Sequence, residues 1–341
     1  MGVSSSKTRF DPHNDLPDLT GRVILVTGGN RGLGYATVRH LVRKGAKVYL
    51  AARNGAKAEA AIARFKEEGL TPGNGEVVKL ELDLCDPRNA KKAAQEFTNK
   101  EDRLDVLTEA VNVISSLVSP FVLTRELLPT LKKTASQPDS DVRIVVVAST
   151  GHRLLFGKPR FRTIQELNDE CGYMLVPGFT RYCRSKLANV LYTSELDRRL
   201  SSSTVPYESN IIAVSVHPGL VNTISHKPAI ARLRLDSFVD WLASFVSVTP
   251  DIGAYNSVYA AVVPVIRMER RKYEGGFMIP IGVPVTPGEG ALKWWNGGPE
   301  VTGKEDGQDA SRRKTEEDHE WEERGRELWE TVEGFLREKG I

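Results

Sequence analysis

Short runs of aliphatic and β-branched residues alternate along this chain with longer stretches in which apolar residues recur every three or four positions. The short runs are apolar at nearly every position, which is typical of parallel strands buried on both faces. The longer stretches have the period of amphipathic helices. Strands are predicted at residues 23–26, 47–52, 77–82, 104–107, 143–148 and 211–216. The alternation indicates an α/β fold with a doubly wound parallel sheet.

The domain organisation is predicted to be simple, because no internal repeat or linker divides the middle of the chain. We expect a polar leader over residues 1–18 and a single domain over residues 19–298. Residues 299–341 are predicted to form a charged linker and an amphipathic helix that docks on the domain, although such a helix can also bind a partner. The apolar stripe of this helix consists of Trp321, Leu328, Val332, Phe335 and Leu336.

The composition is that of an ordinary soluble protein, with 40% hydrophobic and 27% charged residues. The formal net charge is only +3, and basic residues are interspersed with acidic ones, so we expect no nucleic-acid partner. The cysteines Cys85, Cys171 and Cys183 are far apart in the sequence and form no metal-ligand pattern. Reduced thiols and no metal site are therefore expected.

The cellular location is predicted to be the cytoplasm. The chain has no apolar run long enough for a transmembrane segment and no secretory signal. The opening residues MGVSSS match the short pattern for N-myristoylation at Gly2, with Lys7 and Arg9 as nearby contacts for anionic lipid. A lipid-tethered form is therefore an alternative, and a homo-oligomer stays open.

A glycine-rich turn, TGGNRGLG, connects the first predicted strand to the helical stretch that follows. Glycines at this point let the backbone approach a pyrophosphate, whose charge is met by the helix N-terminus. A glycine cluster between a buried strand and a helix is a more specific signal than the cluster alone. The predicted dinucleotide contacts are Gly28, Asn30, Arg31, Gly32, Leu33 and Gly34.

The second predicted strand ends at Arg53, where a fold of this kind that prefers NAD carries Asp or Glu for the ribose hydroxyls. Together with Arg31, Arg53 can bind a 2′-phosphate, which favours NADP(H) as the cofactor. The alternative is that both arginines are solvated surface residues. After the third strand, Asp83 and Leu84 are predicted to contact the adenine, although an Asp at a strand end is also a common helix cap.

The candidate reactive groups are Ser149, Tyr182 and Lys186. Ser149 follows the fifth strand, at the sheet edge where such folds bind ligands. Tyr182 and Lys186 are four apart in a predicted helix and share a face. A phenol exchanges protons poorly at neutral pH unless a positive charge favours its phenolate, and Lys186 is predicted to supply that charge. Tyr182 is then the proton donor to a carbonyl oxygen that Ser149 holds.

Two later segments are predicted to border the ligands. The turn HPGLVNT follows the sixth strand, and its backbone is expected to face the nicotinamide through Val221 and Thr223. An apolar helical stripe within residues 224–248 predicts a lid over an apolar substrate. Packing of the same stripe into the core is an equally good interpretation.

These motifs, in this order, resemble the short-chain dehydrogenase/reductase family: TGGNRGLG, an LDL step at Asp83, the serine after the fifth strand, YCRSK and HPGLVNT. The resemblance covers residues 19–273, and the phrases VYLAARN and SKLANVLYTSEL look most like its retinol-dehydrogenase-like branch. It implies a Rossmann-like domain that transfers hydride between NADP(H) and a small hydrophobic alcohol or carbonyl substrate. Similar proteins also serve as tailoring reductases in secondary metabolism.

The chain departs from the family after the fourth strand, where an NNAG motif should stand. LDVL continues here as TEAVNV, and about twenty residues of the family pattern are absent. The catalytic asparagine of the family falls on Asn112 by the local phrase, or on Ser116 by counting back from residues 120–125. A gene-model error, a tolerated deletion and a loss of activity all fit. The alternative function is a catalytically impaired dinucleotide-binding protein that acts through partners.

Overall fold

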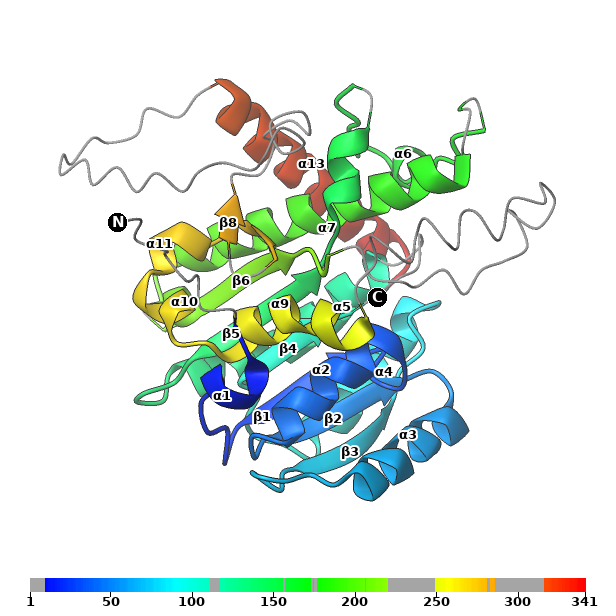
Figure 1. Cartoon of the computed structure of the whole chain (residues 1–341). Helices are drawn as coiled ribbons and strands as arrows, with labels where there is room; N and C mark the ends of the chain where they lie inside the picture. The colour runs from blue at the N-terminus through cyan, green and yellow to red at the C-terminus, as the bar shows by residue number, and fades with distance from the viewer. Residues whose placement is uncertain are drawn as a thin grey trace, which may run out of the picture.

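The computed structural model describes residues 10–110, 117–155, 157–172, 174, 177–205, 207–219, 249–280, 283–285 and 316–341. Their strands form one sheet in the order β3-β2-β1-β4-β5-β6-β7-β8 (Figure 1). The strands up to β7 are parallel to their neighbours, and β8 runs antiparallel to β7. Their bounds are β1 Val23–Thr27, β2 Lys47–Ala52, β3 Glu76–Glu81, β4 Val106–Glu109, β5 Val142–Val147, β6 Ile211–Val216, β7 Phe277–Ile279 and β8 Val283–Val285. The predicted doubly wound parallel sheet is confirmed.

Helices cover both faces of the sheet (Figure 1). One face carries α2 Gly32–Val42, α3 Gly55–Glu68 and α9 Pro250–Val262. The other carries α4 Pro87–Thr98, α5 Val118–Ala135 and α7 Pro177–Ser201, with α13 Glu316–Glu338 packed on α7. The short elements are α1 Pro12–Asp15, η1 Thr150–Leu154, α6 Ile164–Leu167, η2 Glu208–Asn210, α10 Val265–Met268 and α11 Arg270–Tyr273. The sheet is thus sandwiched between two helical layers.

The central strands are buried on both faces, as their uniform apolar sequences predict. Every residue of β1, β5 and β6 is buried. In β5, Ile144 and Val146 pack with α5 and α7, whereas Val145 and Val147 pack with α2 and α9. Side chains that alternate in this way bring apolar groups to both helical layers.

Some boundaries differ from the sequence prediction. β4 begins at Val106 and not at Leu104, because the backbone N–H of Leu104 donates to Thr134 Oγ1 at 2.9 Å. The Asp105 carboxylate accepts from the Val23 backbone N–H at 2.9 Å, while its own backbone N–H donates to the Val23 carbonyl oxygen at 2.8 Å. β7 and β8 were not predicted, since three residues each are too few to show a period. α7 begins at Pro177, so Tyr182 lies in its second turn.

The segments at both ends of the described chain pack on the sheet domain. Phe10 stacks edge-on against Tyr259 of α9 with ring centroids 5.1 Å apart. Leu328 and Val332 of α13 are 1% and 0% exposed and belong to the core formed with α7. No helix in the described part of the chain is both long and apolar enough to span a membrane.

Candidate active site

The candidate site lies at the carboxyl edge of the sheet, where neighbouring strands end side by side. Thr27 ends β1, Ala110 directly follows β4, Ser149 is the second residue after β5 and His217 directly follows β6. The Ala110 backbone N–H donates to Thr27 Oγ1 at 3.0 Å, which joins the first two of these ends. Parallel strands bring groups from distant parts of the sequence to one edge in this way.

The glycine loop packs its backbone tightly between β1, α2 and the end of β4. Gly28 has φ +65°, and a Cβ there would lie 3.0 Å from the Ala110 carbonyl oxygen. A Cβ at Gly34 would collide with the Gly28 carbonyl group. α2 begins at Gly32, and its N-cap residue Arg31 makes no side-chain hydrogen bond to the first turn. The backbone N–H groups of that turn are therefore suited to an anionic group, and the loop fits a dinucleotide pyrophosphate.

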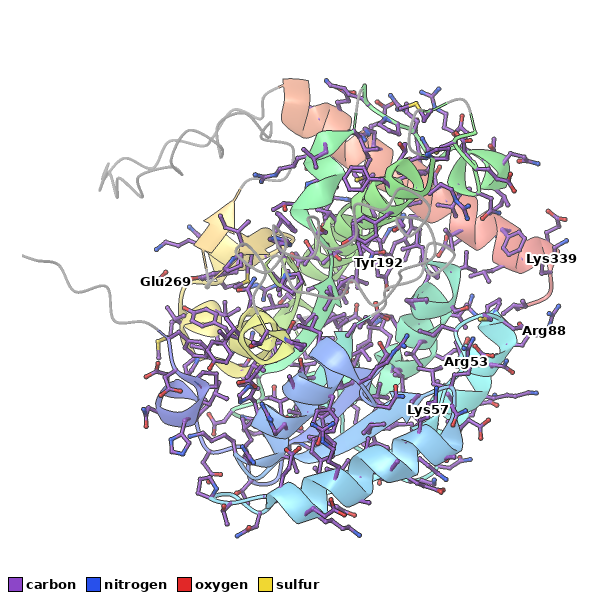
Figure 2. The ribbon with its side chains drawn as sticks, turned by 45° about the vertical axis from the view of Figure 1, so that its right-hand side comes forward. Arg53, Lys57, Arg88, Tyr192, Glu269 and Lys339 are labelled. Carbon is purple, nitrogen blue, oxygen red and sulfur yellow. The ribbon has the colours of Figure 1, made fainter. Side chains whose placement is uncertain are left out.

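The two arginines predicted to select the cofactor are both exposed. Arg53 lies at the surface between α3 and α4 in the view of Figure 2. Its Nη1 is 3.7 Å from Cys85 Sγ, and neither Arg31 nor Arg53 forms an ion pair with any described residue. Cationic groups without an acidic partner are suited to bind a phosphate.

Asp83 forms a local turn, in which its Oδ1 accepts from the Cys85 backbone N–H at 3.0 Å. The N-cap of α4 is Asp86, whose side chain accepts from the Arg88 backbone N–H. The helix-cap interpretation of Asp83 is therefore wrong. Asp83 and its half-buried neighbour Leu84 stay predicted adenine contacts.

Ser149 and Tyr182 meet beyond the end of β5. Ser149 Oγ accepts from the Gly151 backbone N–H at 3.1 Å, which starts η1. A Cβ built on Gly151 would lie 3.4 Å from both Ser149 Oγ and the Tyr182 ring. Burial raises the pKa of Tyr182, and a hydrogen bond with Ser149 opposes that rise. The serine hydroxyl thus favours the phenolate that proton transfer would leave.

Lys186 lies one turn after Tyr182 and is 3% exposed. Its Nζ donates to the Val147 carbonyl oxygen at 3.1 Å and lies 5.8 Å from the centroid of the Tyr182 ring. Burial lowers the pKa of Lys186 to about 8. The Ser149 hydroxyl lowers the pKa of Tyr182 and so favours the phenolate. The supporting role of the Lys186 charge stays a prediction.

The remaining predicted site residues lie outside the described residues. These are Asn112 and its competitor Ser116, the nicotinamide contacts Val221 and Thr223, and the predicted lid at 224–248. Ser149, Tyr182 and Lys186, by contrast, are brought together at one strand end. Within the described ranges, no group of three His, Cys, Asp or Glu side chains is placed to hold a metal ion.

The structure adds buried polar residues that the sequence analysis missed. His152 and His217 are 5% and 4% exposed and lie beside Ser149 and Thr150. Glu109, the last residue of β4, is 2% exposed. The sequence held one usable signal, a histidine three residues after the strand-end serine, but a lone histidine in a turn does not indicate a role.

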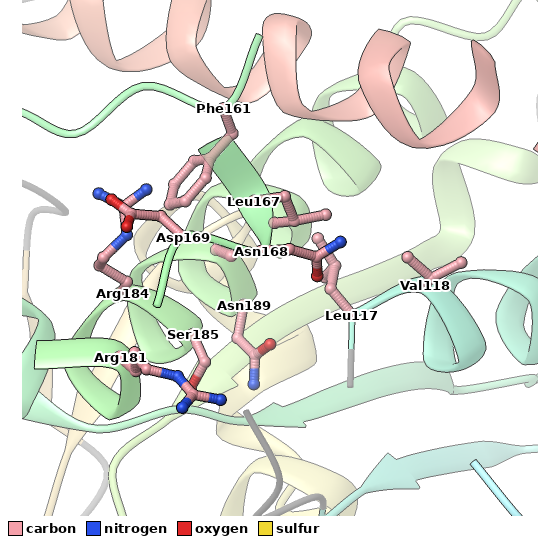
Figure 3. Close-up of a pocket in the computed structure, with 11 residues that line it drawn as sticks. Leu117, Val118, Phe161, Leu167, Asn168, Asp169, Arg181, Arg184, Ser185 and Asn189 are labelled. Atoms are coloured by element: carbon pink, nitrogen blue, oxygen red, sulfur yellow. The ribbon is translucent and has the colours of Figure 1, made fainter. Parts of the chain in front are cut away.

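A pocket opens beside α7, between α6, the start of α5 and the second to fourth turns of α7 (Figure 3). Arg184 lines it, donates to the Glu166 carbonyl oxygen at 2.6 Å and lies 5.3 Å from the Phe161 ring centroid. Arg181 and Ser185 line it from the same face of α7. Tyr182 and Lys186 do not line this pocket, so it adjoins the reactive groups without containing them.

Comparisons with known proteins agree with this geometry. Residues 22–124 match the family model described as short chain dehydrogenase. A short-chain dehydrogenase/reductase of Armillaria gallica is 38% identical over 299 residues, which cover 83% of this chain and 90% of the relative. Human retinol dehydrogenase 11 is 35% identical over 263 residues, which cover 72% and 74% of the two chains. L-sorbose reductase from Gluconobacter frateurii, solved with NADPH and L-sorbose, superposes with a TM-score of 0.56 at 16% identity, covering 79% and 97%.

Proposed function

The chain belongs to the short-chain dehydrogenase/reductase family of oxidoreductases, in the retinol-dehydrogenase-like branch, and we propose that it transfers hydride between NADP(H) and a hydrophobic alcohol or carbonyl compound. One observation carries the proposal: Ser149 and Tyr182 both border Gly151, with Lys186 Nζ 5.8 Å from the Tyr182 ring, at the sheet edge that also holds the glycine loop. A proton donor, a group for the substrate oxygen and a dinucleotide cradle therefore share one edge.

The proton moves through Tyr182. In the reducing direction the Tyr182 Oη–H is donated to the carbonyl oxygen, and in the oxidising direction the phenolate accepts the alcohol proton. Bound NADP(H) supplies or accepts the hydride. The Ser149 hydroxyl holds the substrate oxygen, and Lys186, whose pKa is about 8, still carries its charge at neutral pH. Asn112, with Ser116 as the alternative, stays the predicted fourth residue.

The cofactor preference is proposed from charge. The glycine loop fits the pyrophosphate, and the exposed Arg31 and Arg53 favour the 2′-phosphate of NADP(H). Asp83 with Leu84 would contact the adenine, and Val221 with Thr223 the nicotinamide.

The substrate class is proposed to be apolar. The stripe predicted within residues 224–248 supports a hydrophobic substrate, and the resemblance to tailoring reductases supports a role in secondary metabolism. A cytoplasmic location stays a prediction from the sequence.

The proposal is tested with purified protein by following NADPH oxidation with a panel of long-chain aldehydes and aromatic and cyclic ketones. Tyr182→Phe is expected to lower kcat by about 100-fold or more, because it removes the proton donor. Binding of NADPH, titrated by fluorescence, should stay within about twofold of the wild-type value, since the glycine loop is untouched.

Tyr49→Phe is the matched control, because Tyr49 lies in the core away from the candidate site and loses only its hydrogen bond to Glu101. It should keep the wild-type kcat. A Tyr182→Phe protein with undiminished turnover would remove Tyr182 from the mechanism. A wild-type protein that binds NADPH but reduces no carbonyl would favour the impaired, partner-dependent alternative.

A further inference from the structure

His152 lies in the turn that follows Ser149 and makes two hydrogen bonds to it. Its backbone N–H donates to the Ser149 carbonyl oxygen at 3.2 Å, and its ring Nδ1 lies 2.6 Å from the same oxygen. A carbonyl oxygen can only accept, so Nδ1 carries the hydrogen. The side chain therefore fixes the backbone of Ser149 from the far side of the turn.

The other ring nitrogen of His152, Nε2, is buried without a hydrogen-bond partner among the described residues. The ring packs edge-on against Phe277, with centroids 4.8 Å apart and an interplanar angle of 89°. Leaving a buried nitrogen unpaired destabilises the folded state, and a phenyl ring of similar shape would avoid this cost. The hydrogen bond from Nδ1–H to the Ser149 carbonyl oxygen offsets this cost.

A neutral imidazole agrees with this assignment. Burial lowers the pKa of His152 to about 4, with Arg153 and Arg324 acting in the same direction. At neutral pH the ring therefore carries one hydrogen, and the Ser149 carbonyl holds it on Nδ1. His217 supports the next residue of the turn, since its Nε2 lies 3.3 Å from Thr150 Oγ1.

The direction of the Ser149 hydroxyl depends on this turn. Ser149 Oγ accepts from the Gly151 backbone N–H, which leaves its own hydrogen for Tyr182. We propose that His152 is a positioning residue: its Nδ1–H fixes the Ser149 carbonyl and thereby directs the Ser149 hydroxyl at Tyr182 and the substrate oxygen. The inference rests on the proposed function, because Ser149 acts on substrate only in that reaction.

Three substitutions separate the hydrogen bond from the packing. His152→Asn keeps an N–H donor at the position of Nδ1, His152→Gln places it near Nε2, and His152→Phe keeps only the ring. We expect the Phe and Gln variants to lose roughly 10- to 100-fold in kcat, because the oxygen-binding hydroxyl is misplaced. The Asn variant should recover most of the loss, and the Kd for NADPH should stay within about twofold in all three.

The tautomer of His152 can be measured without enzyme turnover, so this proposal can be tested separately from the proposed function. Nitrogen-15 NMR of histidine-labelled wild-type protein should show His152 as the tautomer protonated at Nδ1 at neutral pH. If the wild-type protein reduces no carbonyl compound, the proposed function is wrong. The spectrum still shows whether Nδ1 of His152 carries the hydrogen that the bond to the Ser149 carbonyl needs.

Three outcomes would overturn the proposal. They are an Nε2-protonated His152, a Phe variant with wild-type kcat, and Asn and Gln variants that are equally impaired. If the Phe variant does not fold, the Asn and Gln pair decides, because both keep an amide of similar polarity.

Discussion

The Glu109 carboxyl group is enclosed between β4, α5 and α7. Its Oε1 accepts from Thr124 Oγ1 at 2.9 Å, and its Oε2 has no partner in the described part of the chain. Burial raises the pKa of Glu109 to about 7, against an ordinary value of 4.5. Its charge also adds to the rise that burial causes in the pKa of Tyr192, an interior residue in Figure 2. Glu109 is therefore a buried acid that ionises near neutral pH.

This acid predicts that folding stability depends on pH. The folded state binds the Glu109 proton more tightly than the unfolded chain, so its contribution is complete below pH 4.5 and is lost as the pH rises through 7. The loss amounts to roughly 3 kcal/mol above pH 7. Glu109→Gln, which cannot ionise, should gain stability over the wild type between pH 5 and pH 8, as measured by urea unfolding.

Burial also raises the pKa of Asp197 to about 7. Asp197 is present in both the wild type and Glu109→Gln, so its titration does not contribute to the stability difference between them. A stability difference between wild type and Glu109→Gln that is the same at pH 5 and pH 8 would show that Glu109 does not titrate in this range.

The sequence indicates the candidate pair Tyr182 and Lys186 more directly than it indicates the buried polar residues around them. Tyr182 and Lys186 are identified by their spacing of four and by the strand-end Ser149 upstream. His152 and Glu109 are not, because their burial depends on residues outside the local pattern, such as Phe277 beside His152 and Thr124 beside Glu109. The environment of a buried polar group depends on tertiary packing, which local periodicity does not contain.

At the scale of elements, ion pairs connect α13 to residues 157–162, which follow η1 in the chain. Arg160 Nε donates to Glu327 Oε2 at 2.7 Å, and Arg162 Nε donates to Glu327 Oε1 at 2.9 Å. Lys158 pairs with Glu320, and the Arg324 guanidinium donates to the Pro159 carbonyl oxygen at 2.9 Å. Isolated surface pairs contribute little, but these share partners and form a network. The helix thus holds residues 157–162 against the domain.

Reversing one charge of this network should loosen the segment. Arg160→Glu and Glu327→Arg are each expected to lower the melting temperature by a few degrees, about what the loss of 1 kcal/mol causes in a large domain. They should also raise the KM for the carbonyl substrate, because the segment follows η1. Combining the two reversals restores opposite charges and should recover part of both losses, measured by calorimetry and steady-state kinetics.

Lys100→Glu is the control, because it breaks an exposed pair with Glu96 on α4. It should leave the KM unchanged. If the double reversal is as impaired as the sum of the single ones, the ion pairs do not couple α13 to the segment.

Long apolar strands were predictable, whereas strand ends and short strands were not. β2 and β6 have the predicted bounds, since their apolar runs end abruptly in polar residues. β4 begins at Val106 and not at Leu104, whose backbone N–H donates to Thr134 Oγ1, 30 residues away in the sequence. Local pattern cannot indicate such a contact.

At the scale of the whole molecule, cofactor binding should stabilise the entire domain, because the glycine loop joins the central β1 to α2. A ligand at 100 times its Kd adds about 2.7 kcal/mol to the free energy of unfolding. NADPH should therefore raise the melting temperature more than equal concentrations of NADH. The double variant Arg31→Ser/Arg53→Ser should lose this difference while keeping the response to NADH.

Arg64→Ser serves as the control, because Arg64 pairs with Glu68 on α3 and should not affect cofactor preference. Equal stabilisation of the wild type by NADPH and NADH would contradict the assignment of the two arginines.

α13 is synthesised after the described strands, so the core that it covers is completed late. Every strand of the sheet leaves the ribosome before this helix does, yet Leu328, Val332 and Leu336 complete the core against α7. Until then the aromatic surface of Phe121 and Tyr192, which Trp329 covers in the folded state, faces water. We therefore expect a chain truncated before residue 316 to expose this surface and to aggregate or be degraded.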